Sequence, residues 1–296
     1  MIQPEEILIR VFVFILGAIV GSFLNVCIVR LPQSQSIVRP RSHCVHCHVL
    51  IPWYDNIPLV SCWILKGRCR FCHKKISLRY FVVELTTALL FLGFYLYFGR
   101  TLLLVPYWVL VSGLIVATFI DLEHRIIPDE ISVGGVVVGL VFSFVFPQLH
   151  GTVSRELAVG RAVIGAIAGG GLLLAMGAPG DRMLLGLRRL GVKLRKHPAW
   201  RRRLARYRHM RDSMGGGDVK LLAMIGSFLG WPTTLLAFFI APFFGAIVGI
   251  IIKLRTKESV IAYGPFLSLG ALVSLFWGRE ILGWIFYQYV WRLGGA

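Results

Sequence analysis

The sequence predicts an all-α polytopic membrane protein with about eight transmembrane helices and a small cytoplasmic four-cysteine domain of zinc-ribbon type. Three observations predict it. Of the 296 residues, 56% are hydrophobic, and the mean hydropathy is +0.73. The chain nevertheless carries a formal charge of +18, and its cysteines include two CxxC pairs. This apolar content excludes a disordered chain and a basic nucleic-acid-binding domain, and the length excludes a small disulfide-stapled secreted fold.

Eight apolar stretches are candidate transmembrane helices, because crossing the hydrocarbon core takes about 17–25 residues of helix. The sixth stretch is short, and glycines interrupt several others, which favours close helix packing or a cavity lining. The first has no basic segment before it and no small-residue cleavage site after it, so it is not expected to be a cleaved signal peptide. The aromatic-rich segment Ile281–Trp291 is expected at the membrane interface. The stretches are Ile7–Ile28, Tyr80–Phe98, Thr101–Ile120, Ile131–Phe146, Ala158–Ala178, Val219–Leu229, Thr233–Ile252 and Tyr263–Trp277.

The distribution of basic residues predicts the orientation. If the eight stretches alternate across the membrane, 26 of the 32 Lys and Arg residues fall in loops on one side. Cytoplasmic loops are the ones that accumulate positive charge, so this side is expected to be cytoplasmic and the N-terminus periplasmic. These loops are Arg30–Arg79, Asp121–Glu130, Pro179–Lys220 and Lys253–Ser259.

The segment 182–211 holds 12 of these basic residues, interleaved with leucines. One interpretation is a basic amphipathic helix that lies on anionic lipid of the bilayer or docks an acidic partner. The other is a solvated loop that only fixes the topology. Nucleic acid is not expected as a partner, because few aromatic residues are interleaved in the segment.

Four of the six cysteines form two CxxC pairs, Cys44 with Cys47 and Cys69 with Cys72, and 21 residues separate the pairs. This spacing predicts a closed tetrahedral site in which four thiolates bind a structural Zn²⁺ ion. A reducing cytoplasm favours thiolates over disulfides. A redox dithiol is the alternative, although it would need only one CxxC pair. The nearby histidines are not expected as ligands, and the remaining two cysteines are expected only to pack.

Two carboxylates fall at the cytoplasmic ends of candidate helices, in a chain with only 14 acidic residues. Asp121 ends the third stretch, and Asp218 follows three glycines and opens the sixth. If these helices are neighbours, the pair could hydrolyse a peptide bond. One ionised carboxylate would activate water, and one protonated carboxyl would support the carbonyl oxygen and the leaving amine. Helix dipoles favour Asp218 as the base and Asp121 as the acid.

These features also have structural interpretations. Asp129 follows Pro128 and is expected to cap the fourth helix. Asp218 could likewise be a helix cap, and the three glycines before it could be a hinge. A GxGD motif by itself is therefore weak evidence.

In combination, these residues resemble the type IV prepilin peptidase family, bifunctional leader peptidases and N-methyltransferases of the GxGD aspartyl-protease type. The resemblance implies a bacterial inner-membrane enzyme, with Asp121 and Asp218 as its catalytic pair. Such an enzyme would cleave the basic leader of type IV prepilins or pseudopilins at the cytoplasmic face and then methylate the new N-terminal residue. The N-terminal cytoplasmic domain would serve methylation, with S-adenosylmethionine as donor. The matching segments are Gly21–Val26, Arg30–Pro32, both CxxC pairs, Trp53–Pro58, Gly67–Arg70, Ile76–Tyr80, the Asp121 segment and Gly215–Lys220.

The methyl-donor site cannot be assigned, because the sequence has no glycine-rich nucleotide loop; the candidates are Asp55, Asn56 and Glu84. The net positive charge does not suit capture of a basic leader. Local acids are therefore expected to attract it, and the candidates are Glu123, Asp129 and Glu130.

The predicted domains are a first transmembrane helix at 1–29, a zinc-binding domain at 30–79, and a transmembrane peptidase core at 80–296 with the basic loop 179–217. Two alternatives to the bifunctional enzyme stay open. One is a peptidase without methylation. The other is a non-enzymatic zinc-ribbon scaffold of a pilus or secretion machine, which would not require both aspartates.

Overall fold

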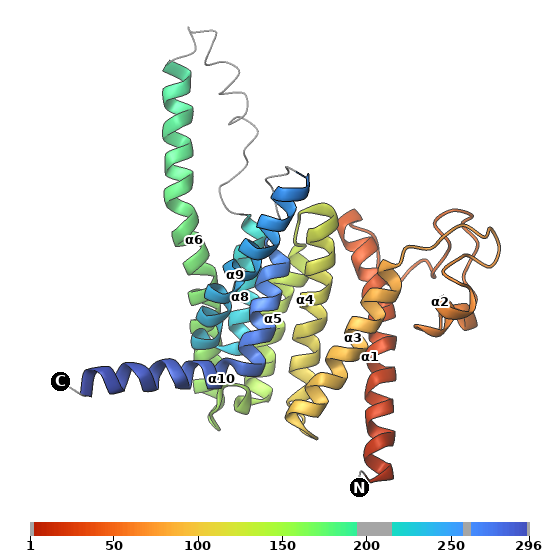
Figure 1. The fold of residues 1–296 in the computed structure, drawn as a ribbon, viewed down its shortest axis with the longest axis horizontal. Helices are drawn as coiled ribbons and strands as arrows, with labels where there is room; N and C mark the ends of the chain where they lie inside the picture. Colours follow the sequence, from red (N-terminus) through yellow and green to blue (C-terminus); the bar gives the residue numbers. More distant parts are fainter. Residues whose placement is uncertain (1–2, 194–214, 257–261, 295–296) are drawn as a thin grey trace.

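The structure is a computed structural model that describes residues 3–193, 215–256 and 262–294. Eight helices of this described part form a bundle, and a loop-rich domain between α1 and α3 stands beside it (Figure 1). The only β-structure in these ranges is two isolated bridges. The elements are α1 Pro4–Arg30, η1 Leu31–Gln33, η2 Trp53–Asn56, α2 Val60–Ile64, α3 Arg79–Phe98, α4 Leu104–His124, α5 Asp129–Val145, η3 Pro147–His150, α6 Arg155–Lys193, α8 Gly216–Leu229, α9 Trp231–Thr256 and α10 Gly264–Gly294.

The expected all-helical polytopic fold is confirmed, but the count of spans differs. Six of the described helices are long and apolar enough to cross a membrane: α1, α3, α4, α6, α9 and α10. The other two, α5 and α8, have 17 and 14 residues. At 1.5 Å per residue they reach only about 25 and 21 Å, against a hydrocarbon core of about 30 Å. The short helix α8 contacts α5, α6, α9 and α10, so protein surrounds it where a full span would meet lipid.

Two apolar clusters divide the bundle, and α4 contributes to both. One cluster joins α4 to α1 and α3 and includes Ile28, Phe94 and Ile120. The other joins α4 to the helices from α6 onward and includes Leu114 and Leu221. Helix α4 is therefore the wall that the two halves share, and it stands between them in Figure 1.

Glycines make the closest helix contacts in both halves. A Cβ atom built on Gly17 of α1 would lie 2.7 Å from the Cα atom of Ala88 in α3. A Cβ atom on Gly165 of α6 would lie 2.1 Å from the carbonyl oxygen of Gly226 in α8. No side chain fits at such distances, so the two backbones themselves are in contact. The expectation that glycines serve close packing is confirmed.

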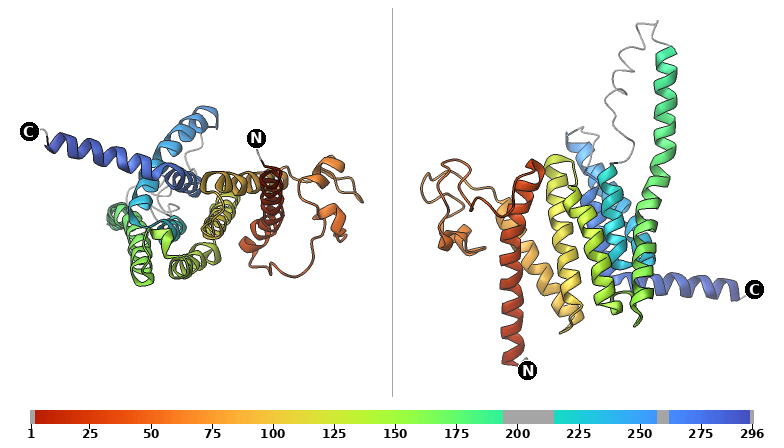
Figure 2. Two further views of the ribbon diagram at one scale, coloured as in Figure 1. Left: turned by 90° about the horizontal axis from the view of Figure 1, so that it is seen from below. Right: turned by 180° about the vertical axis from the view of Figure 1, so that it is seen from behind.

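The two ends of the bundle carry different extensions. Helix α10 starts inside the bundle and then turns, so that its last part projects sideways from the bundle, away from α1 (Figures 1 and 2). This part holds Ile281–Trp291, the segment expected at the interface. At the other end α6 projects past its neighbours as far as Lys193. The side chains of the basic segment 182–211 lie outside the described residues.

His150 lies in η3, at the end of the bundle where the chain passes from α5 to α6. Its Nε2 atom lies 2.8 Å from the hydroxyl of Ser143, and Arg161 donates to the carbonyl of His150 at 2.7 Å. Burial, together with the charge of Arg161, lowers the pKa of His150 to about 4. An unperturbed histidine titrates at about 6.5, so this ring stays neutral in the folded protein under mildly acidic conditions.

The substitution Gly165→Ala should lower the free energy of unfolding by about 1–3 kcal/mol, because the new methyl group would clash with the backbone of α8. Thermal unfolding in detergent measures the change. Gly171→Ala is the matched control on the same helix: its Cβ atom would meet nothing within 4 Å. Equal melting temperatures for the two variants would contradict the close contact.

Stability should fall as the pH drops from about 6.5 towards 4, because in this window the unfolded state binds a proton at His150 that the folded state does not. His150→Gln should remove that part of the pH dependence, measured as melting temperature against pH. A wild-type slope in His150→Gln would show that another group titrates.

Candidate functional site

Asp121 and Asp218 come together at one end of the bundle. Asp121 lies in the last turn of α4 and is 6% exposed, and Asp218 lies in the first turn of α8. The two helices contact each other, and both contact α10. The two carboxylates are close enough to repel each other electrostatically. The fold thus joins two acids that stand far apart in the sequence.

The start of α10 completes this site. The backbone N–H of Gly264 donates a buried hydrogen bond to Oδ2 of Asp121 at 2.9 Å. A Cβ atom on Gly264 would lie 2.8 Å from the same oxygen, so only glycine allows this approach. Tyr263 lies within electrostatic reach of Asp218. Sequence reasoning missed both residues, because neither belongs to an acid–base motif; the only signal was a Gly-Pro pair at the start of an apolar stretch.

The glycines before Asp218 provide space. A Cβ atom on Gly215 would lie 3.0 Å from Oδ2 of Asp218, and one on Gly217 would lie 3.0 Å from Cβ of Ile127. Gly216 has open space around it. Gly215 has an ordinary φ of −62°, so it is needed for the room beside the carboxylate rather than for an unusual backbone.

Two of the three acids expected to attract a basic leader already have partners. Arg79 forms an ion pair with Glu123, and Lys220 forms one with Asp129 at 2.6 Å. The expected helix cap at Asp129 is wrong. Pro128 occupies the cap position, and Asp129 is the first helical residue, with its carboxylate turned to Lys220. Among the described residues Glu130 forms no ion pair, so it is the acid of the three whose charge stays available.

The four cysteines of the CxxC pairs gather at one point in the domain between α1 and α3. Their sulfur atoms all lie within 4.8 Å of one another. The sulfurs of Cys44 and Cys72 are 3.9 Å apart, and those of Cys47 and Cys69 are 4.0 Å apart. Four sulfurs bound at 2.3 Å to one tetrahedral ion would be about 3.8 Å apart. The cluster therefore has the dimensions needed to hold a metal ion.

Both CxxC pairs are built on the same turn. In each, the N–H of the first cysteine bonds at 3.0 Å to the carbonyl five residues later. The residue after the second cysteine is a histidine with a φ of 57° or 56°. These histidines therefore shape the turns. The equivalent residues are Cys44, Val49 and His48 in the first turn, and Cys69, Lys74 and His73 in the second.

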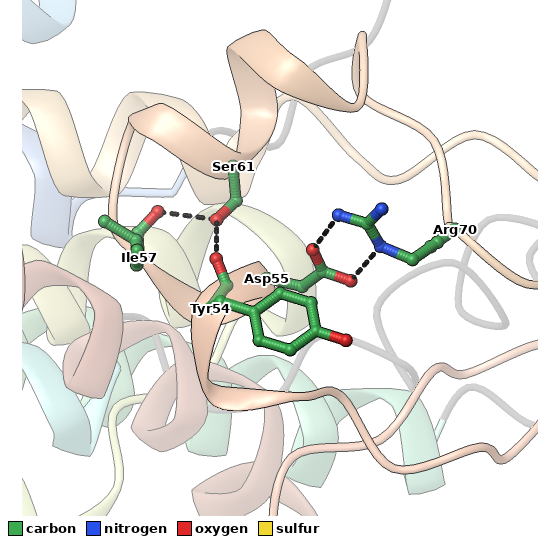
Figure 3. A network of polar contacts seen from close by, with 5 residues as sticks. All are labelled: Tyr54, Asp55, Ile57, Ser61 and Arg70. Atoms are coloured by element: carbon green, nitrogen blue, oxygen red, sulfur yellow. Dashed lines mark hydrogen bonds and ion pairs between the residues drawn. The ribbon is translucent and has the colours of Figure 1, made fainter.

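An ion pair holds the linker between the two turns (Figure 3). The guanidinium of Arg70 donates to both carboxylate oxygens of Asp55, at 2.7 and 2.5 Å, and lies 5.5 Å from the ring centre of Tyr54. These bonds to Arg70 lower the pKa of Asp55. The hydroxyl of Ser61 donates to the carbonyl of Ile57 at 2.8 Å. Asp55 is thus occupied in supporting the loop.

Glu84 attaches this domain to the bundle. Its Oε2 atom accepts a hydrogen bond from the N–H of Leu59 at 2.8 Å, and Ser22 of α1 bonds to the same carboxylate. Two of the three residues considered for the methyl-donor site, Asp55 and Glu84, therefore have structural partners. The third, Asn56, lies on the wall of two cavities.

Two family models match the chain. The bacterial peptidase A24 N-terminal domain matches residues 15–98, and the type IV leader peptidase family matches residues 108–250. Among curated proteins, the prepilin leader peptidase/N-methyltransferase of Myxococcus xanthus is 40% identical over 252 residues, which cover 85% of this chain and 65% of that protein. The proteins of the same name from Aeromonas hydrophila and Legionella pneumophila are 33% and 30% identical, and these alignments cover 92% and 90% of each chain. No solved structure matches the chain.

Proposed function

Because this chain belongs to the type IV leader peptidase family, we propose that it is a prepilin peptidase and N-methyltransferase. It cleaves the basic leader of type IV prepilins or pseudopilins at the cytoplasmic membrane face and then methylates the new N-terminal residue. The names of its relatives support both activities. The observation that carries the peptidase half is the pair of neighbouring carboxylates at one end of the bundle. A non-enzymatic scaffold would have no use for two like charges held together.

The proposed catalytic pair is Asp121 and Asp218. The N–H of Gly264 donates to Oδ2 of Asp121 and so orients this carboxyl, while its other oxygen is free to carry the proton that the pair shares. Asp218 stands at the N-terminus of α8, where the helix dipole favours the charged form. On this ground we take Asp218 as the base that removes a proton from the attacking water, although the two repelling carboxylates titrate as a pair that shares one proton. Asp121 is the acid that supports the scissile carbonyl and then protonates the leaving amine.

We further propose that Cys44, Cys47, Cys69 and Cys72 bind a structural Zn²⁺ ion. Their sulfur separations support this, since they match a tetrahedral thiolate site. Four protein ligands leave no open position for a substrate, so the ion would stabilise the fold of the domain. S-adenosylmethionine is the proposed methyl donor.

The proposed orientation places the N-terminus in the periplasm and both sites at the cytoplasmic face. The 26 basic residues of the loops on one side support it, because α5 and α8, although short, also carry the chain from one end of the bundle to the other (Figure 1), so the loops keep their alternation. In the proposed domain organisation, residues 1–29 form a first transmembrane helix. Residues 30–79 carry out methylation, and residues 80–296 carry out cleavage. Anionic lipid is a proposed contact of the basic segment 182–211.

Asp121→Asn and Asp218→Asn should each slow cleavage of a prepilin in detergent by roughly 100- to 10,000-fold, because each removes a group that transfers a proton. Mass spectrometry of the product measures cleavage, and added S-adenosylmethionine should add the mass of one CH2 group. Glu156→Gln, in the first turn of α6, is the control and should cleave like the wild type. Full activity of Asp218→Asn would refute the pair, and a product that never gains CH2 would refute methylation.

Cys69→Ser should lose stoichiometric zinc, because three thiolates hold the ion far less tightly than four. Elemental analysis of the purified protein measures the zinc content. Cys62→Ser is the matched control, since Cys62 lies in α2 and outside the cluster. Full zinc in Cys69→Ser would rule out the proposed site.

A further inference from the structure

Two cavities meet where the four-cysteine domain faces α1. The first, of about 270 Å³, lies at the C-terminal end of α1, beside Arg30. The second, of about 700 Å³, runs along α1 from Phe14 to Val26. Val26, Ser42 and Asn56 line both cavities. The two spaces are therefore neighbours with a common wall.

The first cavity offers groups suited to a charged molecule with an aromatic base. The indole of Trp53 lines it and is 74% exposed, so one ring face is available for stacking. Arg41 belongs to the same wall, and a guanidinium can pair with a carboxylate. Ile37 and Ile51 add apolar surface. The volume is close to the lower end of the range for small-molecule sites, about 300 Å³.

Arg30 fixes the shape of this cavity. Its side chain is buried, and its two Nη atoms donate to the carbonyls of Ser36 and Pro40 at 2.9 and 2.8 Å. The loop that closes the cavity is thereby tied to the end of α1. The cavity is built by a buried polar side chain and is not a gap between mobile surface loops.

The second cavity has a different character. Its α1 wall, from Phe14 to Val26, is largely apolar and falls within the candidate span Pro4–Gln33. Residues 56–60 form the opposite wall. An apolar segment that lies in the bilayer can enter such a groove, whereas a small water-soluble molecule gains little there.

We propose that the first cavity binds S-adenosylmethionine and that the second receives the apolar N-terminal segment of the cleaved pilin. The new α-amine then lies at the common wall, beside Asn56 and Ser42. This inference rests on the proposed methyltransferase activity. That reaction must bring a water-soluble donor to an amine at the end of a membrane-embedded segment, and the two cavities satisfy these two demands side by side.

The chemistry at the common wall balances without a further reactant. The lone pair of the neutral amine attacks the methyl carbon, the C–S bond breaks with its electrons going to sulfur, and the methylated amine releases a proton to water. An α-amine has a pKa of about 7.7–8.0, so part of it is neutral near pH 7. The amide oxygen of Asn56 can accept an N–H of this amine and so aim its lone pair.

The test is titration calorimetry of the full-length protein in detergent with S-adenosylmethionine. Trp53→Ala and Arg41→Ala should each weaken binding roughly tenfold or more, since a stacking platform or a charged hydrogen bond is lost. Trp63→Ala and Arg39→Ala are matched controls. Both residues are exposed in the same domain, and neither lines either of the two cavities. The controls should bind like the wild type. Zinc content and prepilin cleavage should stay unchanged in all four variants, which verifies folding.

Asn56→Ala separates the common wall from the donor cavity. It should methylate a cleaved pilin roughly tenfold more slowly even when S-adenosylmethionine saturates the protein, so that a loss of donor affinity at this shared wall does not account for the effect. Wild-type methylation by this variant would overturn the position of the amine. Wild-type binding by Trp53→Ala and Arg41→Ala would overturn the donor cavity while leaving the proposed function intact. A wild-type protein that neither binds the donor nor methylates would overturn the proposed methyltransferase activity as well.

Discussion

Backbone contact at glycines is the constraint on which the rest of the structure depends. Helices in lipid gain little from the hydrophobic effect when they associate, so close van der Waals contact must hold them together. Gly165 against Gly226 brings α6 onto α8, which fixes the helix that carries Asp218. Gly17 brings α1 onto α3, the helix whose Glu84 holds the four-cysteine domain. These glycine contacts thus set the positions of Asp218 and of the four-cysteine domain.

Helix α4 connects these regions. Asp121 lies in its last turn, and Glu123, two residues further on, forms an ion pair with Arg79 at the start of α3. The chain enters α3 directly from the four-cysteine domain. Asp121 and the exit of the domain are therefore held to each other through one short stretch of α4.

The sequence predicted the features that depend on local spacing and failed where distant parts of the chain meet. The CxxC pairs and the two aspartates stand out because their residue types and positions are unusual in an apolar chain. Hydropathy marked α8 as a span but could not reveal that this 14-residue helix is surrounded by other helices. Gly264 was missed because it acts through a backbone N–H, which every residue except proline possesses. The expected cap at Asp129 failed because Lys220, from another helix, binds its carboxylate.

The 21-residue linker between the two cysteine turns has one more consequence. Residues 51–60, which contribute to the walls of both cavities, lie inside this linker. An ion held by all four sulfurs converts the linker from an open chain into a closed ring and removes much of its conformational freedom before any small molecule arrives. The ion would then order the residues that line both cavities without contacting a ligand bound in them. Loss of such an ion would loosen the cavity walls formed by residues 51–60, although no cysteine lies in either wall.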